Sequence, residues 1–468
     1  MVANYKLDPQ PVNSTGDIVA GDAKSRGMDK ILLGSLAESG ALRNLWLDIS
    51  GEQVVAILGK RGTGKSYTLG VLLEGMASNA ENNNLAKHET ERGALVFDIM
   101  DIFWSSQIPL NDTAISREFQ EQYKVMKKKG YSSYDLNVNI LIPAGHENDK
   151  IDPPNVQLLR LRGSDLSVED WGSLFDVDIY TEPRGMLIHD LVVYVSEEGY
   201  TDKDGNQIDA VADFSVNDLV ACLNTSSAIA NDFQDITIRS IRQRLGTYSR
   251  LPMFQGEPTP LENIVMNRTA TVLMLGRVEN SLKNVIVSVL LNRIMRDRSM
   301  SSLARKQLDL DPNLNNQKRE ELENTITNSI PRSWVLLDEA HVLAGTDESS
   351  VAKDALIRYA KEGRNHGMSL AVATQQPSAL DTRLMSQAET LIMHQLTSPK
   401  DAEIGFHNIR SPLPDSIKID GSVSDLKKLL RQLGQGSAIF SSGNAPNLKR
   451  ACVVNIRPRI SAHGGYEA

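Results

Sequence analysis

Short, wholly apolar runs alternate with amphipathic stretches along most of this sequence. Runs of four to six apolar residues are typical of strands that are covered on both faces, as in a parallel sheet. We predict strands at 54–58, 94–99, 140–143, 270–275, 334–337, 370–374, 390–394 and 438–441. Apolar residues at helical spacing predict helices at 66–76, 215–223, 236–248 and 280–297. This alternation predicts an α/β fold around a doubly wound, mostly parallel sheet.

The same pattern divides the chain into regions. Residues 1–45 mix Pro, Gly and polar residues around one short apolar patch, which predicts an extended arm with a strand or two. The range 166–262 has helical sequence and is predicted to be an insertion into an α/β core made of 46–165 and 263–443. Residues 299–330 lack clear periodicity, so we predict an exposed connector with one helical piece around 318–324. Residues 444–468 are left as a C-terminal tail.

Composition narrows the class of protein. A chain of 468 residues with 41% hydrophobic and 23% charged residues is typical of a soluble globular protein. The formal charge of −9 excludes a basic field over the whole surface, so any nucleic acid would be held locally. No apolar run reaches the roughly 18 residues of a membrane-spanning helix, and a cytoplasmic location is expected. Cys222 and Cys452 have no metal-ligand spacing, so they are predicted to be structural thiols.

The most specific motif directly follows the predicted strand at 54–58. It reads Gly59-Lys60-Arg61-Gly62-Thr63-Gly64-Lys65-Ser66 and leads, through Tyr67, into a predicted helix. Glycines let backbone N–H groups face a β-phosphate, Lys65 neutralises the β- and γ-phosphates, and Ser66 offers a hydroxyl to Mg²⁺. A glycine-rich turn without nucleotide is the alternative, and the position between a buried strand and a helix disfavours it. We therefore predict a P-loop that binds ATP and Mg²⁺ through these residues and Tyr67.

A second motif supplies carboxylates. The apolar run 334–337 leads into Asp338-Glu339-Ala340-His341. Asp338 is predicted to hold Mg²⁺, and Glu339 to orient and polarise the attacking water. A pair of helix-capping carboxylates is the alternative. The same tetrapeptide occurs in two-lobed DEAH helicases, but no QxxGRxGR-like run follows here, and the 129 residues after Glu339 are too few for a second lobe.

Three further motifs make a family resemblance specific. They are the EGRxxG pattern around Arg364, the ATQxPS pattern containing Gln375, and the LxSQxxTxIxxxL pattern over 384–396. Together with the P-loop and the DEAH tetrapeptide, they resemble the HerA/FtsK family of ring-shaped DNA-translocating ATPases, in its HerA branch. The resemblance covers roughly 46–165 and 263–460.

The resemblance implies a RecA-like core and a homohexamer that hydrolyses ATP at subunit interfaces and acts as a translocase or helicase on double-stranded DNA. It implies that Arg364 reaches the γ-phosphate of the neighbouring subunit and that Gln375 is a polar sensor between Glu339 and that phosphate. An exposed helix arginine and a plain strand-terminal glutamine are the alternatives. A nuclease or another effector, in DNA end processing or antiviral defence, is the implied partner. Gln376 stands where family members commonly have Arg, and residues 1–45 are short for the family's N-terminal β-barrel, which implies a reduced one.

Two points stay open on the sequence. The basic run 124–129 either lines a DNA pore or is a solvated helix face, and Phe103-Trp104 is predicted to pack rather than to stack on bases. An ATP-gated ring scaffold that regulates an effector, with little translocation, is the competing function. A protein remodeller of the AAA+ class is disfavoured, since no helical lid with an arginine is evident after the last predicted core strand.

Overall fold

The structure is a computed structural model. It describes residues 5–6, 17–21, 29–37, 43–78, 84–346, 349–411, 417–419, 422–424, 426–443, 445 and 451–465. Within this part of the chain, no helix is both long enough and apolar enough to cross a membrane. The predictions for residues 1–45 and 444–468 fall partly outside the described residues.

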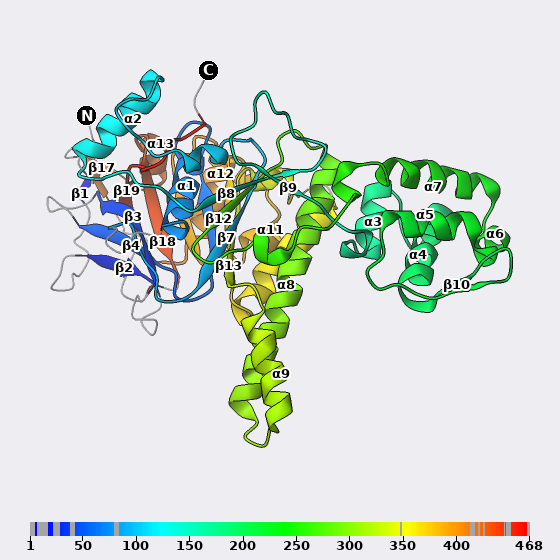
Figure 1. The fold of residues 1–468 in the computed structure, drawn as a ribbon. Helices are drawn as coiled ribbons and strands as arrows, with labels where there is room; N and C mark the ends of the chain where they lie inside the picture. The colour runs from blue at the N-terminus through cyan, green and yellow to red at the C-terminus, as the bar shows by residue number, and fades with distance from the viewer. Residues whose placement is uncertain are drawn as a thin grey trace.

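A large mixed sheet lies at the centre of the described structure (Figure 1). Its strands run in the order β2-β4-β3-β19-β18-β15-β5-β14-β13-β7-β12-β8-β9, and β6 pairs with β3. From β15 to β9 every pairing is parallel. These parallel strands are β15 (Thr390–Met393), β5 (Val54–Leu58), β14 (Met368–Thr374), β13 (Arg332–Leu337), β7 (Arg92–Asp98), β12 (Ala270–Met274), β8 (Val138–Pro143) and β9 (Gln157–Leu159). The predicted α/β class and mostly parallel sheet are confirmed.

Helices cover both faces of the parallel strands. Val55 and Ile57 of β5 pack in the cluster that contains α1 (Lys65–Met76), whereas Val54, Ala56 and Leu58 pack in the cluster that contains α8 (Asn280–Leu310) and α10 (Val351–Glu362). Side chains of a strand alternate between faces, so an unbroken apolar run is what such a two-sided environment requires. The sheet is therefore doubly wound.

The part of the sheet beyond β15 is mostly antiparallel and joins the two ends of the chain. It consists of β4 (Asn44–Asp48), β3 (Lys30–Leu36), β19 (Cys452–Ile456), β18 (Ser437–Ser442) and the short β6 (Ala86–Lys87), with β2 (Ile18–Ala20) added parallel to β4. Strand β19 pairs with β3 on one side and with β18 on the other. The described strands of the N-terminal region thus extend the central sheet through a C-terminal strand.

Two helical parts stand out from the sheet in Figure 1. One holds α3 (Val168–Phe175), α4 (Pro183–Val193), α5 (Val216–Thr225), α6 (Ser227–Asp232), α7 (Asp235–Tyr248) and the hairpin of β10 (Tyr200–Thr201) with β11 (Gln207–Ile208). These helices lie within the range 166–262, and the division into domains stays a prediction. Both cysteines are buried, Cys222 on α5 and Cys452 on β19.

The second projecting part corrects the first half of the prediction for 299–330, where helix continues instead of a connector, and it confirms the helical piece around 318–324. Helix α8 runs on to Leu310, and α9 (Asn316–Thr327) folds back against it, as Figure 1 shows. Only Ser301, Ala304 and Leu322 of this distal hairpin are buried. So few buried residues give the sequence no visible helical periodicity.

Smaller elements complete the fold. Helix α2 (Arg117–Lys128) lies beside the C-terminal segment, and a small sheet joins β1 (Tyr5–Lys6), β16 (Ile417–Ile419) and β17 (Ser422–Ser424). The remaining helices are α11 (Thr382–Met385), α12 (Pro399–His407) and α13 (Leu426–Gln432).

Candidate nucleotide site

Three neighbouring strands bring together most of the residues predicted to act on nucleotide. In the order β5-β14-β13, each strand ends at the same edge of the sheet. The P-loop follows β5, Gln375 follows β14, and Asp338 and Glu339 follow β13. The carboxyl edge of a parallel sheet is where α/β proteins bind ligands, so residues far apart in sequence meet at one site.

The P-loop has the backbone of an anion cradle. Gly62 and Gly64 have φ angles of 77° and 116°, a left-handed region that side-chain-bearing residues rarely adopt. Among the described residues, no side chain caps the N-terminus of α1, and its first turn holds no acidic residue. The N–H groups of that turn are therefore available to a ligand, and the helix dipole favours an anion there.

Lys65 is held inside the loop. Its side chain is 5% exposed, and Nζ donates a 3.1 Å hydrogen bond to the carbonyl oxygen of Lys60. Burial lowers the pKa of Lys65, and the nearby Glu339 and Asp338 oppose that shift. The ammonium is thus largely desolvated. A phosphate that reached it would have little water to displace from it, so their attraction would be stronger than in bulk water.

Asp338 lies at the base of the site with 1% of its surface exposed. Burial raises the pKa of this carboxyl to about 6, against the hydrogen bond from the Ser66 side chain and the attraction of Lys65. Ser66 and Asp338, the two residues predicted to hold Mg²⁺, are therefore in contact. Oδ1 of Asp338 accepts the backbone N–H of Glu339 at 2.9 Å.

Glu339 occupies an unusual backbone position. Its φ and ψ are 49° and 46°, which turns the chain sharply at the end of β13. Burial raises the pKa of its carboxyl, whereas Lys65 and the backbone N–H of Gln375 lower it. Gln375 thus contacts Glu339 through its main chain, and its predicted role as a sensor stays a prediction.

The donor set fits a hard divalent cation. Asp338 Oδ2 and Glu339 Oε2 are buried oxygens that accept no hydrogen bond from the described part of the protein. Buried oxygens without a partner are costly, and carboxylate and hydroxyl oxygens are the ligands that Mg²⁺ prefers. Asp338 and Ser66 would hold Mg²⁺ here, and the role of each residue remains a proposal.

Two histidines support the site. His341 Nδ1 lies 3.1 Å from Thr374 Oγ1 and 3.4 Å from Glu339 Oε2. His394, at the end of β15, is fully buried: its Nδ1 lies 3.1 Å from the carbonyl oxygen of Ser437, and its Nε2 lies 2.8 Å from Thr68 Oγ1. A carbonyl only accepts, so Nδ1 carries the proton and Nε2 accepts from Thr68. His394 therefore ties β15 and β18 to the P-loop helix.

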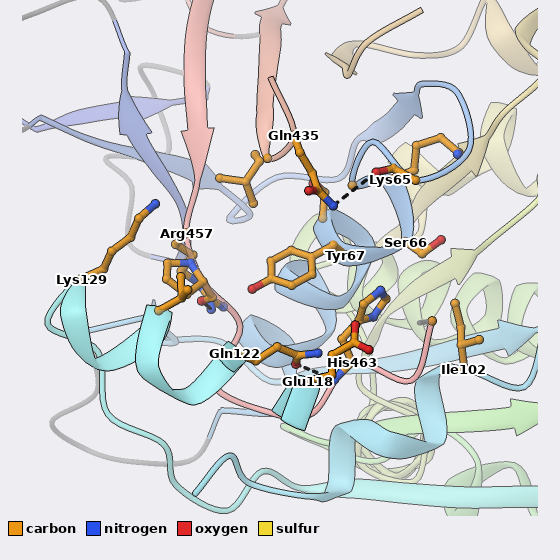
Figure 2. A pocket seen from close by; sticks show the side chains of 18 residues that line it. Lys65, Ser66, Tyr67, Ile102, Glu118, Gln122, Lys129, Gln435, Arg457 and His463 are labelled. Carbon is orange, nitrogen blue, oxygen red and sulfur yellow. Dashed lines mark hydrogen bonds between the residues drawn. The ribbon is translucent and has the colours of Figure 1, made fainter. Parts of the chain in front are cut away.

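A cavity of 440 Å³ adjoins the P-loop (Figure 2). Gly64, Lys65 and Ser66 border it on one side, and α2 and the C-terminal segment on others. Tyr67 projects into it, as Figure 2 shows, and the Tyr67 hydroxyl accepts the backbone N–H of Arg459 at 2.7 Å. The volume lies within the usual range for small-ligand sites.

Arg364 is not part of this group. It follows α10 and precedes β14, so it lies at the opposite edge of the sheet, about 20 Å away along a strand of this length. The side chain is 69% exposed, and Nη1 lies 3.4 Å from Glu389 Oε1. Arg364 therefore cannot reach the P-loop of its own chain.

Two predictions bear on DNA contact. Phe103 is buried and Trp104 packs against the same core cluster, as predicted. Lys124 lies on the exposed face of α2, 2.8 Å from Glu121. The solvated helix face is what one chain shows, and a DNA pore lined by 124–129 remains a hypothesis.

Comparison with known proteins gives a consistent match. Residues 31–294 match the family model described as the central domain of helicase HerA, a range that holds the P-loop and ends before Asp338. The DNA double-strand break repair helicase HerA of Pyrococcus furiosus is 26% identical over 185 residues, 37% of this chain and 33% of that protein. The protein of the same name from Sulfurisphaera tokodaii is 26% identical over 170 residues, 36% of this chain and 30% of that protein.

The matched segments thus span about a third of the length of these curated relatives. Among solved structures, VirB4 of Thermoanaerobacter pseudethanolicus superposes with a TM-score of 0.48 at 18% identity, covering 91% of this chain and 96% of that one.

Proposed function

This chain belongs to the family of the HerA helicase central domain, and from that premise we propose that it is an ATP-hydrolysing motor that forms a hexameric ring and moves double-stranded DNA. The observation that carries the proposal is the group of buried Lys65 and Asp338 with half-buried Ser66 and Glu339 at one edge of the sheet. This group has the charges, and the carboxylate oxygens without a hydrogen-bond partner, that a magnesium nucleotide requires.

ATP with Mg²⁺ would supply the phosphoanhydride bond and the charge neutralisation for its cleavage. The chain's own residues would orient the phosphates, hold the cation and accept the proton from water. Lys65 and the N–H groups of α1 orient the phosphates, and Ser66 and Asp338 hold the cation. Glu339 accepts a proton from water at Oε2, the carboxylate oxygen without a hydrogen bond. Raising the pKa of Glu339 by burial makes it a better base near neutral pH.

The position of Arg364 supports a ring. A guanidinium that stabilises charge on a γ-phosphate must approach it within contact distance. Arg364 lies at the far edge of its own sheet and is exposed, so only another subunit can bring it to a P-loop. A closed head-to-tail ring repeats such a contact at every interface.

Double-stranded DNA is the proposed substrate, and a nuclease or another effector is the proposed partner, in the cytoplasm and without a membrane. The proposal draws on the HerA relatives, whose names state a role in double-strand break repair. A net charge of −9 instead favours an ATP-gated scaffold with little translocation, and this is the second candidate.

Steady-state ATP hydrolysis by the oligomer of defined size, with and without linear duplex DNA, separates the two. A motor is expected to hydrolyse ATP several-fold faster on duplex, with Lys65→Ala as the inactive control. Slow hydrolysis that duplex DNA leaves unchanged would overturn the motor and favour the scaffold.

A further inference from the structure

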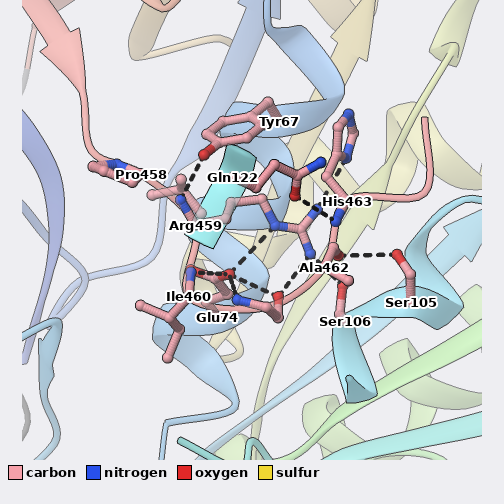
Figure 3. A network of polar contacts seen from close by, with 12 residues as sticks. Tyr67, Glu74, Ser105, Ser106, Gln122, Pro458, Arg459, Ile460, Ala462 and His463 are labelled. Carbon is pink, nitrogen blue, oxygen red and sulfur yellow. Dashed lines mark hydrogen bonds and ion pairs between the residues drawn. The ribbon is translucent and has the colours of Figure 1, made fainter. Parts of the chain in front are cut away.

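The cavity beside the P-loop is closed by a part of the chain that follows the last strand of the sheet. Ile456, Arg457, Pro458, His463 and Gly465 line it, opposite the P-loop residues. They belong to the segment 456–465, which runs across α1 (Figures 2 and 3). A nucleotide with its phosphates on the P-loop would therefore have this segment beside its sugar and base.

One buried carboxylate holds the segment in place. Glu74 of α1 is fully buried, and every hydrogen bond that its oxygens are shown to accept comes from residues 457–461 (Figure 3). Arg457 Nη1 donates to Oε2 at 2.6 Å, and Oε1 accepts from Arg459 Nε at 3.3 Å, from the Ile460 and Ser461 N–H groups at 2.9 Å and from Ser461 Oγ at 2.7 Å. Burial raises the pKa of Glu74, but Arg457 and Arg459 outweigh burial and hold it below its ordinary value.

The fit around Arg459 needs a glycine on the P-loop helix. A Cβ on Gly70 would lie 2.5 Å from Arg459 Nη1, and Arg459 is itself fully buried. Its guanidinium also donates to Ser106 Oγ at 2.6 Å and to Ser461 Oγ at 2.9 Å. Segment and helix are thus interlocked in one arrangement rather than loosely apposed.

The interlock orients two groups toward the cavity. Arg459 Nη1 lies 3.2 Å from His463 Nδ1, and because a guanidinium only donates, the imidazole proton is on Nε2. Burial, with the charge of Arg459, lowers the pKa of His463 to about 3, so the ring is neutral. The backbone N–H of His463 donates to Gln122 Oε1 at 3.2 Å, which leaves the NH₂ group of the Gln122 amide as a donor. The His463 ring stands edge-on to Tyr67 with centroids 5.4 Å apart.

We propose that segment 456–465, anchored by Glu74, is the nucleobase wall of the ATP site, with Tyr67, His463 and Gln122 as its base-contacting residues. This inference rests on the proposed function and deepens it. Tyr67 offers an aromatic face to a purine, and His463 Nε2–H and the Gln122 amide offer donors to its ring nitrogens. Glu74 cannot reach the base and is a positioning residue.

The test compares a ligand that has a base with one that has none. Purified variants are titrated with a non-hydrolysable ATP analogue and, separately, with inorganic tripolyphosphate, both with Mg²⁺. His463→Ala and Gln122→Ala should each weaken binding of the analogue by about three- to tenfold and leave tripolyphosphate binding unchanged. Glu74→Gln should weaken the analogue further, again without changing tripolyphosphate binding.

Matched controls lie outside the cavity. Gln120→Ala is on the same helix as Gln122, where its amide bonds the carbonyl of Ala114, and His407→Ala removes an exposed histidine of α12. Both should bind the two ligands as the unaltered protein does. Because Glu74→Gln leaves two buried arginines uncompensated and can unfold the chain, the His463 and Gln122 variants decide the outcome.

The nucleobase wall would be overturned if the His463 and Gln122 variants bound the analogue as tightly as the unaltered protein does. It would also be overturned if they lost affinity for the analogue and for tripolyphosphate to the same extent. In either case tight binding of both ligands by the unaltered protein would leave the proposed ATPase standing. If the unaltered protein binds neither ligand, the proposed function fails and the inference with it.

Discussion

At the carboxyl edge of the parallel sheet, Lys65 and Asp338 keep only 5% and 1% of their surface exposed. At the amino edge, the side chain of Arg364 is 69% exposed and meets a single carboxylate, Glu389, whose side chain is 26% exposed. The first edge is packed and desolvated, as a catalytic centre requires. At the second edge, Arg364 has little to do within its own chain, because an exposed ion pair contributes little stability. The contrast supports the proposal that one chain carries two halves of a site at opposite ends of one sheet.

Removing Lys65 should produce the largest effect at the carboxyl edge. Lys65→Ala takes away the buried ammonium that faces the phosphates, so binding of ATP should fall below detection in a titration with Mg²⁺. Lys318→Ala is the control, because it removes an exposed lysine of α9, outside the P-loop. Tight ATP binding by Lys65→Ala would place the nucleotide elsewhere.

Removing Arg364 should stop catalysis without weakening binding. Arg364→Ala is expected to lower kcat by about 10³-fold or more, with the ATP affinity of the isolated chain unchanged, since the arginine lies far from its own P-loop. Arg358→Ala, on the preceding helix, is the control. A kcat within about threefold of the unaltered protein would leave Arg364 as an ordinary surface residue.

Glu339→Gln tests the predicted proton acceptor at the carboxyl edge. The amide keeps the shape of the side chain but loses the ability to accept a proton, so kcat should fall by about 10²- to 10⁴-fold while ATP still binds. Single-turnover hydrolysis with prebound ATP measures this directly. Undiminished hydrolysis would remove Glu339 from its role.

The smallest effect is a pH dependence at Asp338. Burial raises the pKa of this carboxyl to about 6, so it takes up a proton as the pH falls through that value. Protonation removes the charge that would hold Mg²⁺, and the gain in nucleotide affinity from Mg²⁺ should fall about tenfold per pH unit below about 6. Asp338→Asn should show a small gain that does not change with pH. An unchanged gain between pH 5 and 7 in the unaltered protein would contradict the assignment.

Features made by residues that are adjacent in sequence could be predicted, and contacts between distant residues mostly could not. The strand at 54–58, the loop after it and the helix from Lys65 are adjacent in sequence, and their pattern of apolar and glycine residues was sufficient. The meeting of Asp338 with Ser66 could be anticipated because both follow parallel strands. Glu74 and His394 were missed because each is a lone buried polar residue with distant partners: those of Glu74 lie more than 380 positions away in sequence, and those of His394 lie 43 and 326 positions away. No local pattern records such partners.

The same reasoning explains two features of the fold that the sequence did not predict, the pairing of β3 with β19 and the distal part of α8. Strands β3 and β19 pair across more than 400 residues, so neither end of the chain shows its partner in its own pattern. The distal part of α8 buries little more than Ser301 and Ala304, so its apolar stripe is too sparse to predict, whereas a helix around 318–324 was predicted.

Mixing two inactive variants tests most directly whether one chain's two edges serve different sites. Arg364→Ala and Lys65→Ala subunits are each expected to be inactive alone. In mixed rings, an Arg364→Ala subunit keeps an intact P-loop, and a Lys65→Ala neighbour supplies the intact arginine, so ATP hydrolysis should reappear at those interfaces. Hydrolysis that stays absent, in rings shown by mass to contain both variants, would contradict a site completed by the neighbouring subunit.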